Sequence, residues 1–264
     1  MTRYHYEPFS KAVATKFLTS QADSLVIRAR NSADFLATQF VLREARLINR
    51  SASAAWCGIG GRLPVDLWLA GQMSAAGAYT DDTTDAQDAG AGDFALDVQS
   101  TNNAGFGLFS LVPFNIVSIV TSQAGSGGTP AWDLRYTKAG GSWGTITNAY
   151  VMPDFSGAPG EYLIWFEAPT DWAVSEAGHG TGVPTGYYGL NVRATTAPTA
   201  AASLATLITL GYMVRAMELG AAGGVGDLIE DEEVPLPPQC DALCAAFATA
   251  NVQNYASGLF RFKG

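Results

Sequence analysis

Residues 132–143 read WDLRYTKAGGSW, and this stretch decides the fold class. Trp132, Leu134 and Tyr136 alternate with the polar residues Asp133 and Arg135. An alternation with a period of two places apolar side chains on one face of a β-strand and polar ones on the other. The two glycines that follow predict a tight turn. The stretch therefore predicts a β-hairpin with one wet face and one dry face.

Comparable short runs occur on both sides of this hairpin. Their ranges are 94–98, 114–121, 162–166 and 188–193, and turn-forming segments at 125–130, 156–160 and 178–186 separate them. Several short strands joined by turns are typical of a sandwich or a barrel. We therefore predict an all-β fold, a β-sandwich of the jelly-roll type with extended N- and C-terminal segments. The run Tyr162–Phe166 is apolar on both faces and needs cover on both.

The rest of the chain gives weaker patterns. We expect strands at Ser24–Arg30 and Val65–Ala70 and a short helix at 241–250, and we favour a strand over a helix at 35–48. The segment 200–219 fits either an alanine-rich helix or a buried strand. Three parts follow: a basic N-terminal docking arm at 1–62, the β-sandwich at 63–220, and an acidic, proline-containing linker with a C-terminal tail at 221–264.

Composition excludes several classes of partner. The net charge of −9 argues against nucleic acid, whose phosphates an acidic chain repels. The longest uncharged apolar stretch, residues 200–214, is shorter than the roughly 20 residues that span a bilayer, so no membrane partner is expected. Cys57, Cys240 and Cys244 lack a nearby histidine that would complete a zinc site. We predict simple thiols and no cofactor.

The charge is unevenly distributed. Residues 1–62 carry nine Lys or Arg and four Asp or Glu, whereas the remaining residues carry six and 20. Such asymmetry indicates a docking segment for an acidic partner. The candidate partner-binding residues are Arg28, Arg30, Arg43, Arg46 and Arg50, because arginine pairs carboxylates through two hydrogen bonds. The alternative is that these arginines form salt bridges within the chain.

One short pattern suggests a hydrolase. Residues 140–144 fit G-x-S-x-G around Ser142, and Asp171 and His179 follow in the order found in hydrolases. A nucleophile elbow requires a strand-to-helix turn, whereas this serine lies in a predicted hairpin between strands. We interpret the motif as a glycine-rich turn beside a core tryptophan and predict no catalytic residues.

Acidic and aromatic clusters have similarly ordinary explanations. The aspartates of 81–93 suit either calcium or capped turns, and the turns are favoured because the spacing is not that of an EF-hand. Four carboxylates offer a glycosidase pair, which requires a separation of roughly 5–10 Å: Glu161, Glu167, Asp171 and Glu176. Four tryptophans suit either glycan stacking or core filling, and core filling is favoured: Trp132, Trp143, Trp165 and Trp172. We predict no enzymatic activity.

The order of four motifs resembles a known family. The motifs are Trp132–Tyr136, Gly140–Trp143, Ala168–Trp172 and Gly186–Arg193, preceded by an entry segment at Tyr79–Ala86. Together they resemble the β-sandwich modules of accessory virion proteins of tailed bacteriophages, in which a hairpin ending in tryptophan, a P-x-D-W corner and a closing strand recur in this order. The resemblance covers residues 79–196, about half of the chain. The closing strand departs from it at Tyr188-Gly189, where the family has bulkier residues.

The resemblance implies a structural role in the virion, assembled in the host cytoplasm. It implies a head decoration, cement or head-fibre protein first, and a tail- or fibre-associated module that binds a glycan or a receptor second. The expected partners are the major capsid protein or another virion protein, and further copies of the chain. We expect a closed homo-oligomer, because strands that are apolar on both faces, such as Tyr162–Phe166, indicate buried contacts between copies. The specific prediction is a trimer, which the resemblance implies because the head proteins of that family often sit at threefold positions.

Overall fold

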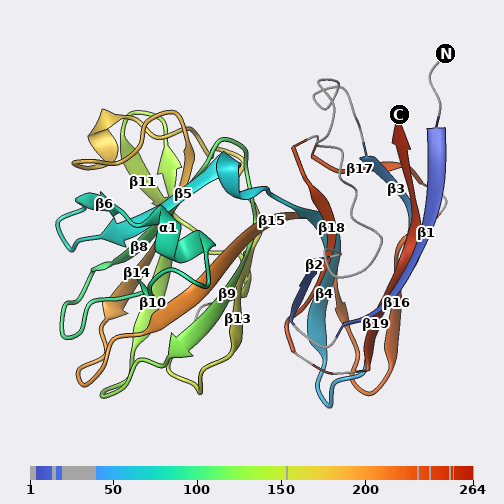
Figure 1. Cartoon of the computed structure of the whole chain (residues 1–264), viewed down its shortest axis with the longest axis horizontal. Coiled ribbons are helices and arrows are strands. Elements are labelled where there is room, and N and C mark those ends of the chain that lie inside the picture. The colour runs from blue at the N-terminus through green and yellow to red at the C-terminus, as the bar shows by residue number, and fades with distance from the viewer. Residues whose placement is uncertain are drawn as a thin grey trace. The chain divides into compact units, whose positions relative to one another are not determined.

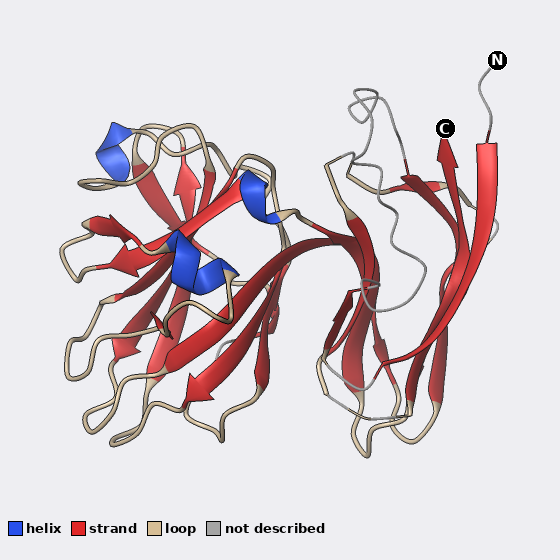
Figure 2. Cartoon of the chain, viewed as in Figure 1, coloured by secondary structure: helices blue, strands red, loops and turns tan. Residues whose placement is uncertain are grey.

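The computed structural model describes residues 4–13, 16–19, 40–152, 154–230, 232–237, 239–249, 251 and 253–263. Strands make up 52% of the structure and helices 5%, which confirms the predicted all-β fold (Figure 2). Within these ranges the helical elements are one short α-helix and two 3-10 turns: α1 Thr83–Gln87, η4 Val65–Leu67 and η5 Ala177–His179. No helix in these ranges is long and apolar enough to cross a membrane.

The chain divides into two compact units. The first, here called the terminal unit, combines Met1–Pro64 with Leu210–Gly264, and the second, the central unit, is Val65–Thr209. The predicted boundaries at 62 and 220 separate the two ends of the chain into different parts, whereas the structure groups both ends in one unit. The described parts of the predicted arm and tail form strands that pair with one another, because each end of the chain supplies apolar residues that neither end can bury alone.

One sheet of the terminal unit has the strand order β1-β19-β3-β16, with β17 also paired to β3 (Figure 1). Its strands are β1 Tyr4–Val13, β19 Asn254–Lys263, β3 Phe40–Asn49, β16 Gly224–Ile229 and β17 Val234–Pro235. Strand β1 pairs with β19 along its whole length and lies at the sheet edge. The edge position suits Pro8, which has no N–H to donate to a second neighbour.

The other sheet of the terminal unit is built on β4 Ala55–Arg62, which pairs with β18 Ala242–Phe247 and with β15 Leu204–Leu219. Strand β2, Phe17–Thr19, pairs with β18. Buried residues of both sheets form one core, so the unit is a sandwich. They include Leu42 and Leu47 of β3, Ile59 of β4, Leu243 and Phe247 of β18, and Ile229 of β16. Burial of each such side chain stabilises the fold by roughly 1.5–3 kcal/mol.

Glycines in β4 allow close contact with its neighbours. A Cβ on Gly60 would lie 2.0 Å from the carbonyl oxygen of Tyr212, and one on Gly61 would lie 2.3 Å from the sulfur of Cys240. Both positions therefore exclude a side chain. The strand is not visible in the sequence pattern, because glycine weakens that pattern while it permits the packing.

The central unit contains a six-stranded sheet of order β11-β10-β14-β8-β5-β6. The strands are β11 Ser142–Thr145, β10 Ala131–Lys138, β14 Tyr188–Thr196, β8 Gly105–Ser110, β5 Trp68–Met73 and β6 Tyr79–Asp81. Its second sheet has β12 Ala149–Val151, β13 Glu161–Phe166 and β9 Ile116–Gln123 in that order, followed by the first part of β15, which also pairs with β7 Phe94–Ala95.

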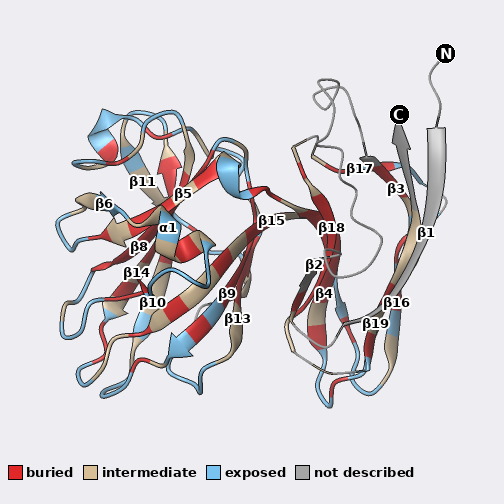
Figure 3. Cartoon of the chain, in the orientation of Figure 1, coloured by how far each residue is buried: buried red, intermediate tan, exposed pale blue. Residues whose placement is uncertain are grey.

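Aromatic side chains fill the core of the central unit. Phe106 of β8 lies 5.8 Å from Phe94 and 6.4 Å from Phe155, measured between ring centroids. Phe114 lies 5.2 Å from Trp172. The rings of Phe94 and Phe106 meet edge-to-face, an arrangement favoured by the charge distribution of aromatic rings, and the other two pairs are tilted. Figure 3 shows β8 buried along its length, as is Leu163–Phe166 of β13.

Most predicted strands of the central unit are confirmed, and the hairpin of residues 132–143 forms β10 and β11. The run Tyr162–Phe166 is β13, and Leu163, Ile164, Trp165 and Phe166 are each at most 2% exposed within a single chain. This strand therefore needs no second copy for cover, contrary to the reason for expecting self-association. The jelly-roll connection of the strands stays a prediction.

Two segments whose patterns fitted either a helix or a strand, 35–48 and 200–219, are strands over most of their described residues. Residues 40–48 lie in β3 and residues 204–219 form β15. The expected helix at 241–250 is wrong, because residues 242–247 form the fully buried strand β18. The expected strand at Val65–Ala70 begins only at Trp68, after the 3-10 turn η4. The predicted strand Ser24–Arg30 lies outside the described residues.

Candidate functional site

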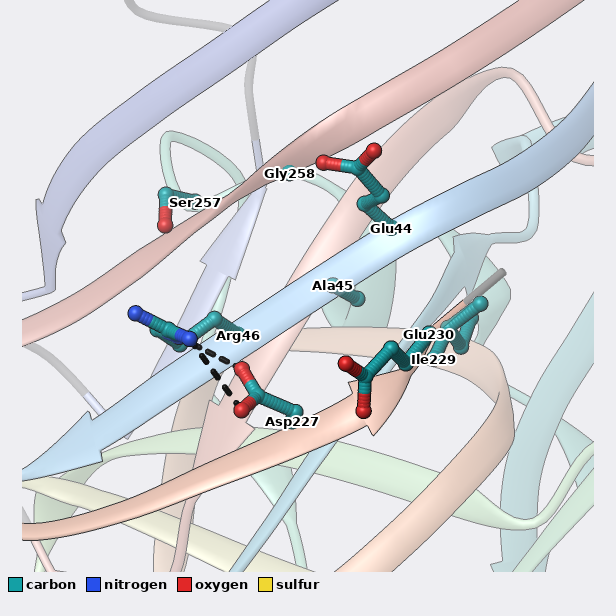
Figure 4. A pocket seen from close by; sticks show the side chains of 8 residues that line it. All are labelled: Glu44, Ala45, Arg46, Asp227, Ile229, Glu230, Ser257 and Gly258. Atoms are coloured by element: carbon teal, nitrogen blue, oxygen red, sulfur yellow. Dashed lines mark hydrogen bonds and ion pairs between the residues drawn. The ribbon is translucent and has the colours of Figure 1, made fainter. Parts of the chain in front are cut away.

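A surface hollow lies on the five-stranded sheet of the terminal unit. It has a volume of about 500 Å³ and is lined by residues of β3, β16 and β19 and the residue that follows β16: Glu44, Ala45, Arg46, Asp227, Ile229, Glu230, Ser257 and Gly258. Side chains alternate between the two faces of β3: Ala45 and Leu47 are buried, whereas Glu44 and Arg46 are exposed and line the hollow. Figure 4 shows the side chains of Arg46 and Asp227 joined across two neighbouring strands.

Arg46 is occupied by an internal ion pair. Its Nε donates to Oδ1 of Asp227 at 2.5 Å and its Nη2 donates to Oδ2 at 3.1 Å. The pairing raises the pKa of Arg46 and lowers that of Asp227. Both side chains are about half exposed, at 57% and 40%, so the pair adds little to stability. With Glu44 and Glu230 also present, the hollow is acidic and attracts cations.

The five predicted partner-binding arginines do not form one cluster in the described residues. Arg46 is paired with Asp227, as the alternative of internal salt bridges expects. Arg43 also interacts within the chain. Arg50 is exposed and forms no ion pair with any described residue. Arg28 and Arg30 lie outside the described residues.

The hydrolase-like motif around Ser142 forms the turn of the hairpin between β10 and β11. Gly140 and Gly141 have φ values of +79° and +71°, which the hairpin between β10 and β11 requires and which disfavour other residues. Nε2 of His179 lies 2.9 Å from the backbone carbonyl oxygen of Ser142, and not on its hydroxyl group. The Ser142 hydroxyl instead points toward the carbonyl of Ala139 at 3.5 Å. A base that activates a serine must bond to its hydroxyl, so this arrangement does not form a catalytic dyad.

Asp171 fixes the P-x-D-W corner. Its Oδ1 accepts a hydrogen bond from the Tyr136 hydroxyl at 2.6 Å, and its Oδ2 lies 2.7 Å from Nζ of Lys138. The bond to Lys138, followed by that to Tyr136, lowers the pKa of the Asp171 carboxyl group. Trp172 then packs against Phe114 at 5.2 Å. The corner thus ties the loop after β13 to strand β10.

Other acidic candidates also have local partners. Asp85 accepts from the backbone N–H of Gly92 at 3.0 Å and Asp88 from that of Gly90 at 2.9 Å, as expected for capped turns. Among the four carboxylates considered as a glycosidase pair, Glu161 accepts a hydrogen bond from Ser118 and Glu167 accepts one from Asn148. Glu176 forms the N-cap of η5. Within the described part of the chain, no group of three or more His, Cys, Asp or Glu is arranged to hold a metal ion.

Three of the four clustered tryptophans pack against core aromatic rings. Trp165 is fully buried, Trp132 lies 4.9 Å from Phe155, and Trp172 packs on Phe114 as described above. Trp143 differs, because its ring contacts Arg135 and His179 on the opposite face of the six-stranded sheet. These positions support core filling over a row of stacking platforms.

We expect the three thiols to be unreactive in the folded protein. Cys57, Cys240 and Cys244 are free and buried. Burial raises the pKa of Cys57 and of Cys240 to about 12, and it also raises the pKa of Cys244 well above its usual range. Because the thiolate is the reactive form, DTNB at pH 8 should label the native chain at a small fraction of its rate in guanidinium chloride. Rapid labelling of the native chain would contradict this burial.

The residues that complete the acidic hollow could not be recognised in the sequence. Asp227 and Glu230 were assigned to a linker, because glycine and acidic residues are rare in strands. Their charge was visible, but the pairing of β16 with β3 was not. A comparison with protein-family models finds no match for the chain, and a search of curated proteins finds none either.

Proposed function

We propose that the chain is a structural protein of a tailed-phage particle, which attaches to other virion proteins and turns over no substrate. The motif order across residues 79–196 is its first support. The observation that carries the proposal is that polar residues of these motifs make structural contacts within the chain. Asp171 and His179 anchor loops to the central sandwich, and Arg193 pairs with Asp133 across two strands. Residues that suggested chemistry thus hold a rigid scaffold together.

We also propose attachment through the basic N-terminal region, with fewer arginines than the five that the sequence suggested. Arg46 is neutralised by Asp227, whereas Arg50 is exposed and unpaired among the described residues. We propose that Arg50 acts together with Arg28 and Arg30 in contacting an acidic virion surface. Exposed charges of this kind mainly raise the association rate and lose their effect as salt screens them.

Substitution of these arginines tests the proposal. A variant with Arg28, Arg30 and Arg50 changed to Gln should bind purified particles at least tenfold more weakly than the unaltered chain in co-sedimentation at low salt. The difference should shrink in 0.5 M NaCl. Arg215→Gln removes one charge from an exposed pair with Glu232 and serves as the control that keeps binding. Equal binding of the triple variant would refute attachment through these residues.

Self-association also stays a proposal. With β13 covered inside the chain, it has to use other exposed surfaces. Sedimentation at micromolar concentration that shows a trimer would support it, and a monomer both in solution and on the particle would remove it.

A second candidate function, glycan binding, is favoured by one hollow of the central unit. This hollow has a volume of about 250 Å³ and presents hydroxyl, amide and carboxylate groups from Tyr136, Thr145, Thr147, Asn148, Glu167 and Thr170. Such groups match the hydroxyl groups of a neutral sugar. A glycan array is the test, with Asn148→Ala expected to remove any signal that this hollow produces.

A further inference from the structure

Arg135 of β10 lacks an acceptor. Its guanidinium carbon lies 5.9 Å from the ring centroid of Trp143, and no described residue accepts a hydrogen bond from it or forms an ion pair with it. The nearest acid is already used, because Asp133 receives Nε of Arg193 at 3.0 Å and Nη2 at 2.5 Å. Partial burial and the charge of Arg193 both lower the pKa of Arg135. Two guanidinium groups therefore share one carboxylate.

Asn191 of β14 lies directly opposite Arg135 in the sheet and is also unsatisfied. The residue is 5% exposed, and its Oδ1 is buried without a donor among the described residues. An unpaired buried polar group costs roughly 1–3 kcal/mol, and folded proteins keep few of them. Two facing residues that both lack partners indicate a missing ligand more strongly than either does alone.

The surface that carries this pair is held in place. Leu134 and Leu190 are buried on the core side of β10 and β14, so Arg135 and Asn191 project from the other side of the sheet. Trp143 is fixed beside them, because its Nε1 donates to the carbonyl of His179 at 3.0 Å and its ring meets the imidazole edge-to-face. The glycine hairpin that resembled a hydrolase motif thus presents Trp143 to Arg135.

We propose that this face of β10 and β14 binds an acidic peptide segment of a partner protein. A carboxylate of the segment accepts two hydrogen bonds from Arg135, whose planar fork matches that geometry. The amide of Asn191 has a donor and an acceptor and pairs with a peptide group of the same segment. The local excess of positive charge selects an anion, because Arg135 and Arg193 share the single carboxylate of Asp133. This site is independent of the arginines near the N-terminus and of the proposed place in a virion.

The test uses the full chain labelled with 5-fluorotryptophan and a hexaglutamate peptide as the probe. The ¹⁹F signal of Trp143, assigned with Trp143→Phe, should shift saturably with peptide concentration. Arg135→Gln should weaken binding at least tenfold, and Arg135→Lys should lose most of it as well, because lysine keeps the charge without the fork. Asn191→Leu should also weaken binding while the melting temperature stays the same or rises, since the asparagine has no partner to lose.

The control is Arg215→Gln, which removes one positive charge elsewhere and should leave the hexaglutamate affinity unchanged. Equal loss in this control would show that binding is general charge attraction and would overturn the proposal. A flat Trp143 signal would overturn it too. So would a shift produced by oligogalacturonate and not by hexaglutamate, because the ligand would then be an acidic sugar.

Discussion

Deletion of residues 1–20 should unfold the terminal unit and leave the central unit folded. The deletion removes β1, which pairs with β19 over ten residues, and β2, which pairs with β18. It also removes Phe17, which is 7% exposed. Loss of one large core side chain alone costs about 3–5 kcal/mol, and the two lost strands add unpaired edges to both sheets. A separate arm, as the sequence suggested, would instead leave the fold intact.

Hydrogen exchange measured by mass spectrometry distinguishes these outcomes. Amides of β18 and β19 should lose protection in the deletion variant, while those of β8 and β14 in the central unit keep theirs. Removal of residues 1–3 leaves β1 whole and is the control that should keep protection everywhere. Full protection of β19 after deletion of 1–20 would show that β1 is dispensable for the fold.

Trp165→Ala should destabilise the central unit by about 3–5 kcal/mol, the range for loss of a large buried aromatic side chain. Trp165 is fully buried on β13 and its ring lies 5.7 Å from that of Tyr150 on β12. The melting temperature of the central unit should fall by roughly 6–20 °C in this variant, given the size of the unit. Differential scanning calorimetry measures this shift.

Two further observations make this test specific. Val65→Ala in the same unit changes a side chain that is 53% exposed and should cost less than about 0.5 kcal/mol. If Trp165 were covered by a second copy, the transition of the unaltered chain would depend on protein concentration, and Trp165→Ala would abolish that dependence. A melting temperature independent of concentration, lowered only by Trp165→Ala, is the expected result.

Sequence patterns predicted the central unit well because its strands obey simple alternation. Leu134 and Tyr136 are buried while Asp133 and Arg135 are less so, as the period of two requires. The pattern failed in β18, whose three alanines, Leu243, Cys244 and Phe247 are buried on both faces between β4 and β2. With no polar face there is no alternation, and alanine then favours helix on propensity alone.

The candidate sites were harder to predict than the strands. A sequence shows that Arg46 is basic and Asp227 is acidic, but 181 residues separate them and only strand pairing brings them together. The same holds for Arg135, which lacks an acceptor because Arg193 occupies Asp133, and for Asn191, which only strand pairing places opposite Arg135. Charge counts therefore predicted a basic docking segment, and the pairing of strands decides which arginines are available for a partner.

Cryo-electron microscopy of particles from cells that encode this chain tests the central proposal most directly. The account predicts density for two β-sandwich units at symmetry-related positions on the particle, with Arg50 against acidic residues of a neighbouring virion protein. Particles that lack the chain, confirmed by mass spectrometry of the same preparation, would contradict a structural role in the virion.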